Sequence, residues 1–402
     1  MMELPILIVQ TNWRLKAASA MLLAPSHQAV SPTHRMREMM NILYTNFHVA
    51  GGGGHDVYIR TLLKQSTHRT YVACPKSSYL YRSLTRDNVA NVLALDFPGR
   101  LSQSVHLVTQ LRRLLTIIAE HQIDIIHTNG SADNRLVSYA RLLSRRHFKH
   151  VFTKHNGFPV RGPISQWRFL KANHAIIFVS QSIYQSIGFS VQSDKIVVIR
   201  NGVDTDYWRP PVTVIPSAQI RLVSIAGTSG YKGWHYLINA LKLLPESVRH
   251  RFTVTIVGTL PDIATRLERC RGDWLPEQVT FTGFMSEPYR TLLNADIGFV
   301  LSDAVETISF ACREMMSAGL PVIVSDFGGL PENITPGMDG WVTPVGDETA
   351  LAALLLEMSA LSPTQLTEMK QQARGKAERE FGIESMIAQT HQVYTQIMSS
   401  TD

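Results

Sequence analysis

Cysteine is scarce in this chain, and the few cysteines stand far apart. The 402 residues include 3 cysteines, Cys74, Cys270 and Cys312, and these lack the close spacing of a metal-binding or redox pair. A framework of disulfide bonds is therefore not expected. The three side chains fit the role of small core residues in a reducing cytoplasm.

Long apolar runs are also missing. No stretch approaches the roughly 18 apolar residues that a membrane-spanning helix needs, so any membrane contact is expected to be peripheral. The net charge of +7 and the pI of about 9.3 favour acidic partners. Because the basic residues are scattered, we do not expect nucleic acid as a partner. An anionic membrane surface or a phosphorylated acceptor fits this charge better.

The remaining composition predicts a globular α/β protein. Hydrophobic residues make up 45% of the chain and charged residues 18%, which is enough for two domains with their own cores. From residue 41 onward, short apolar strand patterns alternate with helical patterns. This alternation predicts two parallel sheets, each covered by helices on both faces, which is the doubly wound arrangement.

We predict five segments along the chain. A clean strand pattern begins only at Asn41, so translation of the native protein is expected to start at or near Met40. The alternative for the preceding segment is a short amphipathic membrane anchor. The predicted segments are an N-terminal extension at 1–39, a first domain at 40–205, a linker at 206–219, a second domain at 220–382 and a returning C-terminal helix at 383–402.

The most informative stretch runs from Asp303 to Val324. It reads as a polar loop with Glu306, a helix with Glu314 and a buried strand. Seven residues separate the two glutamates, so both can face one cleft if the segment is largely helical. Ligands dock beyond the carboxyl ends of such strands, where a carboxylate can accept two sugar hydroxyls. The alternative is that Glu306 caps the helix and Glu314 is solvated.

The surroundings of these glutamates resemble the donor-site signature of the retaining glycosyltransferases of family 4. Ala318-Gly319-Leu320-Pro321-Val322 and Gly328-Gly329-Leu330-Pro331-Glu332 follow the glutamates in that family's order. Asn201-Gly202-Val203-Asp204 and Lys232-Gly233 stand at the places of its interdomain segment and its phosphate-binding lysine. The resemblance implies the GT-B fold, in which two Rossmann-like domains face a central cleft.

The resemblance also implies a role for each matching residue. Glu314 would hold the ribose hydroxyls, Glu306 the donor sugar, and Lys232 the pyrophosphate, with Glu306, His155 and Lys232 as the catalytic set. Phe284 would lie near the nucleotide base, with a buried loop aromatic as the alternative. The implied donor-binding residues are Gly52, Gly53, Gly54, Thr228, Lys232, Gly283, Phe284, Glu306, Thr307, Ile308, Ser309 and Glu314.

Histidines and basic residues follow two strands of the first domain. The resemblance places His155 against the transferred sugar, where a neutral imidazole can bond a hydroxyl without adding charge. The alternative is a histidine satisfied by nearby backbone, and we favour such a hydrogen-bonded role for His127. Lys154 and Arg161 are expected to meet an anionic acceptor, and with Arg168 they otherwise form an exposed, solvated basic face.

Two features bear on metals and on charge at the donor site. Asp204-Thr205-Asp206 has the form of a metal-binding triplet, but it follows an Asn-Gly turn, so we interpret it as turn chemistry. No metal or other cofactor is expected. The family commonly has an arginine beside its lysine, yet no arginine stands between Ala226 and Lys232. The sequence does not indicate which group replaces it.

Together these features predict a retaining transfer from a nucleotide sugar to a hydroxyl of a glycan or glycolipid. The expected setting is lipopolysaccharide or other envelope polysaccharide synthesis, in the cytoplasm and at the inner face of its membrane. Two alternatives stay open, a nucleotide-sugar 2-epimerase of the same fold and a noncatalytic glycosyltransferase-like partner. Donor base and sugar, acceptor, linkage and oligomeric state are not readable from the sequence.

Overall fold

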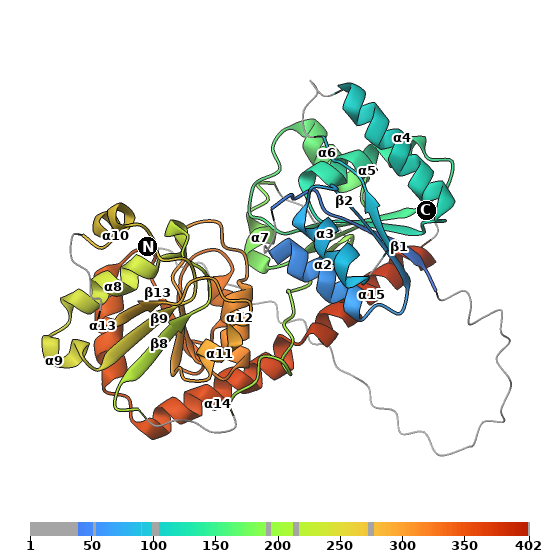
Figure 1. Cartoon of the computed structure of the whole chain (residues 1–402). Coiled ribbons are helices and arrows are strands. Elements are labelled where there is room, and N and C mark those ends of the chain that lie inside the picture. The colour runs from blue at the N-terminus through green and yellow to red at the C-terminus, as the bar shows by residue number, and fades with distance from the viewer. Residues whose placement is uncertain are drawn as a thin grey trace, which may run out of the picture. The chain divides into compact units, whose positions relative to one another are not determined.

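Two parallel β-sheets organise the chain, as the alternating pattern predicts. A computed structural model describes residues 39–50, 54–89, 91–98, 104–189, 194–211, 217–271 and 277–400 (Figure 1). The predictions for residues 1–38, for Gly52 and Gly53 and for the middle of the linker lie outside these residues. Residues from Met40 onward form one unit by their internal contacts.

The first sheet has seven described strands in the order β3-β2-β1-β4-β5-β6-β7, and all neighbours are parallel. We call this sheet with its helices the first lobe. Its strands are β1 (Asn41–Thr45), β2 (Arg69–Cys74), β3 (Asn91–Ala94), β4 (Ile125–Thr128), β5 (Lys149–Lys154), β6 (Ala175–Phe178) and β7 (Ile196–Val198). Its helices are α2 (Gly54–Lys64), α3 (Tyr79–Asp87), α4 (Ser104–Glu120), α5 (Ser131–Leu143), α6 (Pro163–Lys171) and α7 (Gln181–Gln185).

The second sheet has six described strands in the order β10-β9-β8-β11-β12-β13, again all parallel. This sheet and its helices form the second lobe. Its strands are β8 (Ile220–Ser224), β9 (Phe252–Ile256), β10 (Val279–Phe281), β11 (Ile297–Val300), β12 (Val322–Ser325) and β13 (Gly340–Thr343). Its helical segments are η2 (Gly230–Lys232), α8 (Trp234–Leu243), α9 (Glu246–Arg249), α10 (Ile263–Arg269), α11 (Tyr289–Leu292), α12 (Phe310–Ser317), η3 (Leu330–Asn333), α13 (Glu348–Ser359) and α14 (Pro363–Glu380).

The central strands are apolar on both faces because helices cover both sides of each sheet. Every residue of β4, β6, β11 and β12 is buried, which explains why β6 and β11 read as continuous apolar runs rather than alternating ones. The last helix, α15 (Ile383–Ser399), packs on the first sheet. Its Met386 and Tyr394 share a core with Ile42 and Tyr44 of β1.

Each sheet has one point at which the strand order reverses. In the first sheet this point lies between β1 and β4, and in the second it lies between β8 and β11. Loops that leave neighbouring strands diverge there and open a crevice beyond the carboxyl ends of the strands. Among the described helices, none combines the length and the apolar character that crossing a bilayer requires.

Candidate functional site

A cleft of about 730 Å³ lies between loops of the two lobes. In the second lobe, its walls come from the loops after β8 and β11, on the two sides of the strand-order reversal. In the first lobe, they come from the start of α2 and the loop after β5. The lining residues are Gly54, His55, Val57, His155, Asn156, Gly157, Phe158, Asn201, Ile225, Ala226, Ser229, Tyr231, Lys232, Val305, Glu306, Thr307, Ser309, Phe310, Ala311, Glu314 and Phe327.

Lys232 and Glu306 meet in this cleft. The ammonium nitrogen of Lys232 lies 2.8 Å from Oε2 of Glu306, and the hydroxyl of Ser302 donates to the same oxygen at 2.9 Å. The two charged side chains are only 18% and 7% exposed, so water screens the pair weakly. Lys232 is the only lysine or arginine among the described residues that line the cleft.

The loop that carries Glu306 has an unusual backbone at both ends. Val305 has φ of 52° and Ser309 has φ of 61°, which is the left-handed region that β-branched and most other side chains avoid. The Ser309 hydroxyl accepts from the amide of Cys312 at 3.3 Å and so caps α12. Strained backbone of this kind is common in ligand-binding segments. The backbone geometry of the loop and the carboxylate of Glu306 therefore both make it a candidate site.

The two glycines at 328 and 329 are explained by how closely they approach this loop. A Cβ on Gly328 would lie 2.4 Å from the carbonyl oxygen of Glu306, and a Cβ on Gly329 would lie 1.8 Å from that of Thr307. Any side chain would push the loop out of place. The glycine pair therefore fixes the position of Glu306.

Glu314 projects into the cleft from the first turns of α12. Burial raises the pKa of its carboxyl to about 7. No hydrogen bond or ion pair holds this carboxylate among the described residues, so its oxygens remain available to hydroxyl donors. The segment between the two glutamates is a loop followed by a helix, and both side chains line the same cleft, as predicted from their spacing.

The first-lobe wall carries two neutral histidines. The rings of His55 and His155 lie 4.5 Å apart between centroids, and the Tyr58 ring meets His155 edge-on at 4.7 Å. Nε2 of His155 lies 3.1 Å from Oδ1 of Asn129. Burial lowers the pKa of His55 to about 4 and that of His155 well below its usual value, so this wall presents imidazoles without charge at neutral pH.

A second pocket of about 260 Å³ adjoins the cleft. His155, Asn156 and Phe158 line both spaces, while Lys154 and Arg161, the predicted acceptor contacts, line only the second. The interpretation of Lys154 as an exposed basic residue is wrong, because it is only 6% exposed. Its ammonium donates to Oδ1 of Asn156 at 2.9 Å and to the carbonyl of Phe158 at 2.7 Å. Burial lowers its pKa to about 8.

Comparison with known proteins agrees with this geometry. The family profile described as Glycosyl transferases group 1 matches residues 210–376, and the profile described as Glycosyltransferase Family 4 matches residues 52–207. The two profiles adjoin, and they cover strands β2 to β7 of the first sheet and all six described strands of the second. Two glycosyltransferase family profiles thus match the chain in succession, one for each sheet.

Curated relatives share about half of their length with this glycosyltransferase-family chain. The putative colanic acid biosynthesis glycosyltransferase WcaL of Escherichia coli K12 is 29% identical over 197 residues, which is 47% of this chain and 48% of WcaL. The amylovoran biosynthesis glycosyltransferase AmsK of Erwinia amylovora is 31% identical over 207 residues, or 49% of this chain and 50% of AmsK. The chain therefore spans about half the length of these relatives.

Solved structures with a similar fold cover nearly the whole chain. A glycosyltransferase from Rickettsia africae ESF-5 has a TM-score of 0.78 at 19% identity, covering 90% of this chain and all of its own. Anabaena Alr3699/HepE in complex with UDP-glucose has a TM-score of 0.71 at 18% identity, covering 89% of this chain and all of its own. These neighbours confirm the predicted GT-B fold.

Several donor-site residues predicted from the sequence do not line the cleft. Thr228, Gly283, Phe284 and Ile308 lie outside its lining. Phe284 is 90% exposed, so the alternative of a buried loop aromatic is wrong. The side chain of Ile308 is fully buried, and its part in donor binding stays a prediction. Of the predicted glycines, Gly54 lines the cleft, whereas Gly52 and Gly53 lie outside the described residues.

The remaining predicted polar residues have structural partners. Nδ1 and Nε2 of His127 lie 2.6 Å from the hydroxyls of Tyr394 and Thr153, respectively, the hydrogen-bonded role that we favoured. Oδ1 of Asp204 accepts from the amide of Tyr207 at 2.9 Å, which is turn chemistry. Among the described residues, no three His, Cys, Asp or Glu side chains gather as a metal site would need. The absence of a metal stays a prediction.

Sequence reasoning missed several residues of this site. His55, Tyr231 and Phe310 line the cleft, and a Cβ on Gly54 would lie 3.2 Å from the Phe310 ring of the other lobe. His55 follows the glycine run directly, and that position was the one available signal. Nothing in the sequence indicates that Lys232 pairs with Glu306, because the contact depends on how two loops fold back toward each other.

Arg313 was also missed, although it stands beside Glu314. Its side chain is fully buried and its guanidinium lies over the Phe381 ring at 4.3 Å. Nε donates to Oδ1 of Asn333 at 2.8 Å, and Nη1 donates to the carbonyl of Asn201. Arg313 thereby ties α12 to the segment that joins the two lobes.

Proposed function

We propose that this chain transfers a sugar from a nucleotide-sugar donor to a hydroxyl of a glycan or glycolipid, with retention at the anomeric carbon. The observation that carries the proposal is the cleft itself. One cation and two carboxylates reach it from the second lobe, and neutral histidines face them from the first. The relatives WcaL and AmsK are named for the biosynthesis of colanic acid and amylovoran. We therefore propose that the reaction belongs to the synthesis of an envelope or extracellular polysaccharide.

The second-lobe wall suits the donor. Lys232 would contact the diphosphate, Glu306 the hydroxyls of the sugar, and Glu314 both hydroxyls of the ribose. Ionised carboxylates accept paired hydroxyls well, and an ammonium binds phosphate as a point charge. HepE, which shares the fold, has been solved with UDP and with UDP-glucose, and this supports a nucleotide sugar as donor.

The first-lobe wall suits the sugar and the acceptor. Neutral His155 would bond a sugar hydroxyl while Asn129 holds its ring by the 3.1 Å contact to Nε2. Lys154 and Arg161, in the adjoining pocket, would meet anionic groups of the acceptor. The buried ammonium of Lys154 has two oxygen partners already, so we expect Arg161 to contribute more to such binding.

The proposed reaction breaks the bond between the anomeric carbon and the diphosphate oxygen, and forms one between that carbon and the acceptor oxygen. The acceptor proton passes to the departing phosphate oxygen. Two features support this route. The described first-lobe residues of the cleft include no carboxylate, and burial makes the imidazoles of His55 and His155 weak bases. Lys232 would stabilise the negative charge that grows on the leaving diphosphate.

The test is a thermal-shift and turnover screen with UDP-, GDP-, ADP- and CMP-sugars. Wild type is compared with Glu314→Ala and with the matched control Glu357→Ala, because Glu357 is exposed on α13. A ligand at about 100 times its Kd should stabilise the protein by about 2.7 kcal/mol. We expect one donor to stabilise wild type and the control but not Glu314→Ala. The anomeric coupling in the product's NMR spectrum then reports retention or inversion.

A noncatalytic partner is the second candidate, and one observation favours it. The only described cation of the cleft is neutralised by Glu306, and the described residues that line the cleft include no arginine. If no donor shifts the melting temperature of wild type, this second candidate replaces the first. A donor that is consumed without any acceptor, giving an epimeric nucleotide sugar, would instead indicate the 2-epimerase.

A further inference from the structure

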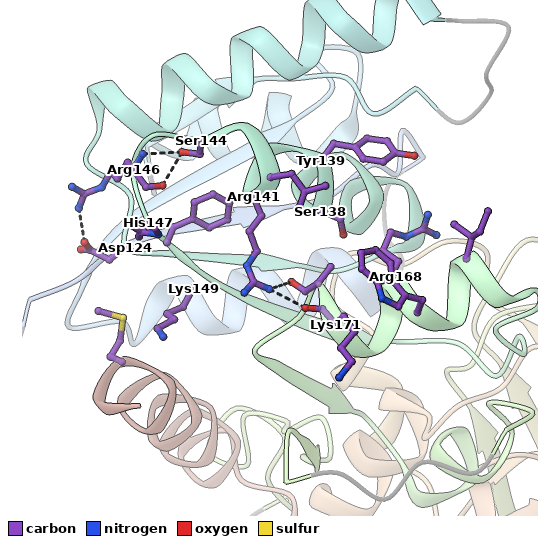
Figure 2. A pocket seen from close by; sticks show the side chains of 16 residues that line it. Asp124, Ser138, Tyr139, Arg141, Ser144, Arg146, His147, Lys149, Arg168 and Lys171 are labelled. Atoms are coloured by element: carbon purple, nitrogen blue, oxygen red, sulfur yellow. Dashed lines mark hydrogen bonds and ion pairs between the residues drawn. The ribbon is translucent and has the colours of Figure 1, made fainter. Parts of the chain in front are cut away.

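A larger pocket of about 810 Å³ lies in the first lobe, between α5, α6 and the end of α15. It shares no lining residue with the cleft. Figure 2 shows the basic side chains of Arg141, Arg146, Arg168 and Lys171 around it. We call the pocket and the two helix faces beside it the α5–α6 surface.

Large apolar side chains of the α5–α6 surface face solvent. Ile164 is 77% exposed, Trp167 is 58% exposed and Leu142 is 74% exposed, and all three line the pocket. Leu143, the last residue of α5, is 60% exposed. Leaving such side chains in water is unfavourable, and apolar groups gathered on one face mark an interaction site.

The helical period places apolar and basic residues together. On α6, Ile164, Trp167 and Lys171 stand at positions i, i+3 and i+7, which share one face. The α5–α6 surface therefore presents a tryptophan and two aliphatic side chains with an ammonium beside them. This combination is typical of helices that lie at the boundary between lipid headgroups and acyl chains.

The charge of the surface is strongly one-sided. Asp124 is the only acidic residue among the 16 described residues that line the pocket, and it pairs with Arg146 at 2.7 Å. The guanidinium of Arg141 is held by the carbonyls of Lys171 and Ala172 at 3.0 and 2.9 Å. These partners are uncharged, so Arg141 keeps its full positive charge. The basic lining residues are Arg141, Arg146, His147, Lys149, Arg168 and Lys171.

We infer that the α5–α6 surface docks on an anionic lipid bilayer. Ile164, Trp167 and Leu142 enter the level of the headgroups, and the surrounding arginines and lysines meet lipid phosphates. Long basic side chains can bury their methylene stems among the lipids and keep their charged ends at the phosphate level. The charge of the pocket selects an anionic surface over a neutral one.

The surface continues toward the proposed acceptor site. Arg168 lines both this pocket and the smaller pocket that holds Lys154, Arg161 and His155. A lipid-linked acceptor in the bilayer would thus reach the cleft along one run of basic side chains. Only this last step rests on the proposed function, since binding to a bilayer needs no sugar transfer.

The test measures sedimentation of the full chain with vesicles. Phosphatidylcholine vesicles are compared with vesicles that also contain phosphatidylglycerol, at low and at high salt. Ile164→Ser/Trp167→Ser removes the apolar groups, and Lys171→Glu reverses one charge. The matched control is Ile263→Ser/Leu267→Ser on α10 of the second lobe, where these side chains are 66% and 48% exposed.

We expect wild type and the α10 control to bind the anionic vesicles at low salt, and both α5–α6 variants to bind about tenfold more weakly. Tryptophan emission should shift to shorter wavelength with these vesicles in wild type, and less so in Trp167→Phe. Equal binding to neutral vesicles, or unchanged binding by the double variant, would overturn the inference. So would a dimer in light scattering that Ile164→Ser/Trp167→Ser abolishes, because a second copy would then cover the surface.

The same variants keep this inference separate from the proposed function. None of the altered residues lines the cleft, so a donor identified by thermal shift should stabilise all of them equally. Vesicle binding without any donor response would leave the docking surface in place and remove the proposed activity. A donor response without vesicle binding would do the reverse.

Discussion

Lys232 and Glu306 form an ion pair of 2.8 Å between two loops that leave the neighbouring strands β8 and β11. The pair has a direct consequence for ligand binding. A diphosphate that binds Lys232 must compete with Glu306, unless Glu306 turns toward the donor sugar at the same time. A complete nucleotide sugar therefore gives Glu306 new partners, the hydroxyls of the sugar, when the diphosphate takes over Lys232. A diphosphate alone gives Glu306 no such partner.

The first prediction follows from this competition. Glu306→Gln removes the competing charge, so inorganic pyrophosphate should bind several-fold more tightly than to wild type. Lys232→Ala removes the cation and should weaken pyrophosphate binding about 10- to 100-fold, since a hydrogen bond to a charged group contributes about 1.5–3 kcal/mol. Isothermal titration calorimetry with pyrophosphate measures both changes without knowledge of the base. Weaker pyrophosphate binding by Glu306→Gln would contradict the competition.

The second prediction concerns the pH dependence of donor binding. Burial raises the pKa of Glu314 to about 7, so the carboxylate form that accepts both ribose hydroxyls dominates only above that pH. Donor affinity should rise as the pH increases from 6 to 8. His55 and His155 titrate well below this range and should not contribute.

The control for this pH dependence is Glu314→Gln, which cannot ionise. Its affinity for the nucleotide sugar found in the screen should be lower than that of wild type at pH 8, and nearly independent of pH. Titrations at several pH values distinguish the two profiles. A variant that keeps the wild-type slope would assign the pH dependence to another group.

The sequence predicted the fold well because its signals are local. Apolar runs mark the strands of both sheets, and the strand order that follows from parallel pairing brings the loops of Lys232 and Glu306 to one edge. Gly328 and Gly329 stood out as a motif. The structure explains them, because a Cβ at either position would collide with the carbonyl oxygen of Glu306 or Thr307.

The rest of the site could not be predicted because it depends on packing between distant segments. The contact between Lys232 and Glu306 joins positions 74 residues apart. Lys154 looked like a surface residue from its loop context, yet the chain folds over it and gives its ammonium two oxygen partners. Phe284 lies on a loop that leaves its ring 90% exposed, and its contact to the base stays a prediction.

The third prediction concerns Arg313 at the junction of the lobes. Arg313→Met removes the donors to Asn333 and Asn201, and leaves two buried acceptors unpaired. The free energy of unfolding should fall by about 1–3 kcal/mol. Arg313→Lys should recover little of this loss, because an ammonium cannot reproduce the fork of the guanidinium. Arg290→Met, at a side chain that is 75% exposed, should change stability by less than about 0.5 kcal/mol in urea unfolding. A similarly small effect of Arg313→Met would show that the junction tolerates its loss.

The fourth prediction concerns stability in acid. His127 is fully buried between Tyr394 and Thr153, and burial lowers its pKa to about 3. In the unfolded chain its pKa returns to about 6.5, so between these values the unfolded state binds a proton that the folded state does not. The stability that neutral His127 contributes is thus present above pH 6.5, and is lost as the pH falls toward 3. The loss is about 1.4 kcal/mol for each pH unit.

The contribution of His127 is separated from those of other groups by comparing the slope of the free energy of unfolding against pH between wild type and a His127 variant. Asp133 and Glu314, whose pKa values burial raises to about 7, act in the opposite direction, and other buried histidines add to the loss. Their contributions are common to wild type and variant and cancel in the difference. His127→Gln should therefore reduce the slope between pH 4.5 and 6 by about one proton in urea unfolding, whatever it does to stability itself. His147→Gln, at an exposed histidine, should leave the slope unchanged. If both variants keep the wild-type slope, His127 is already protonated in the folded protein, and the hydroxyls of Tyr394 and Thr153 both accept from it.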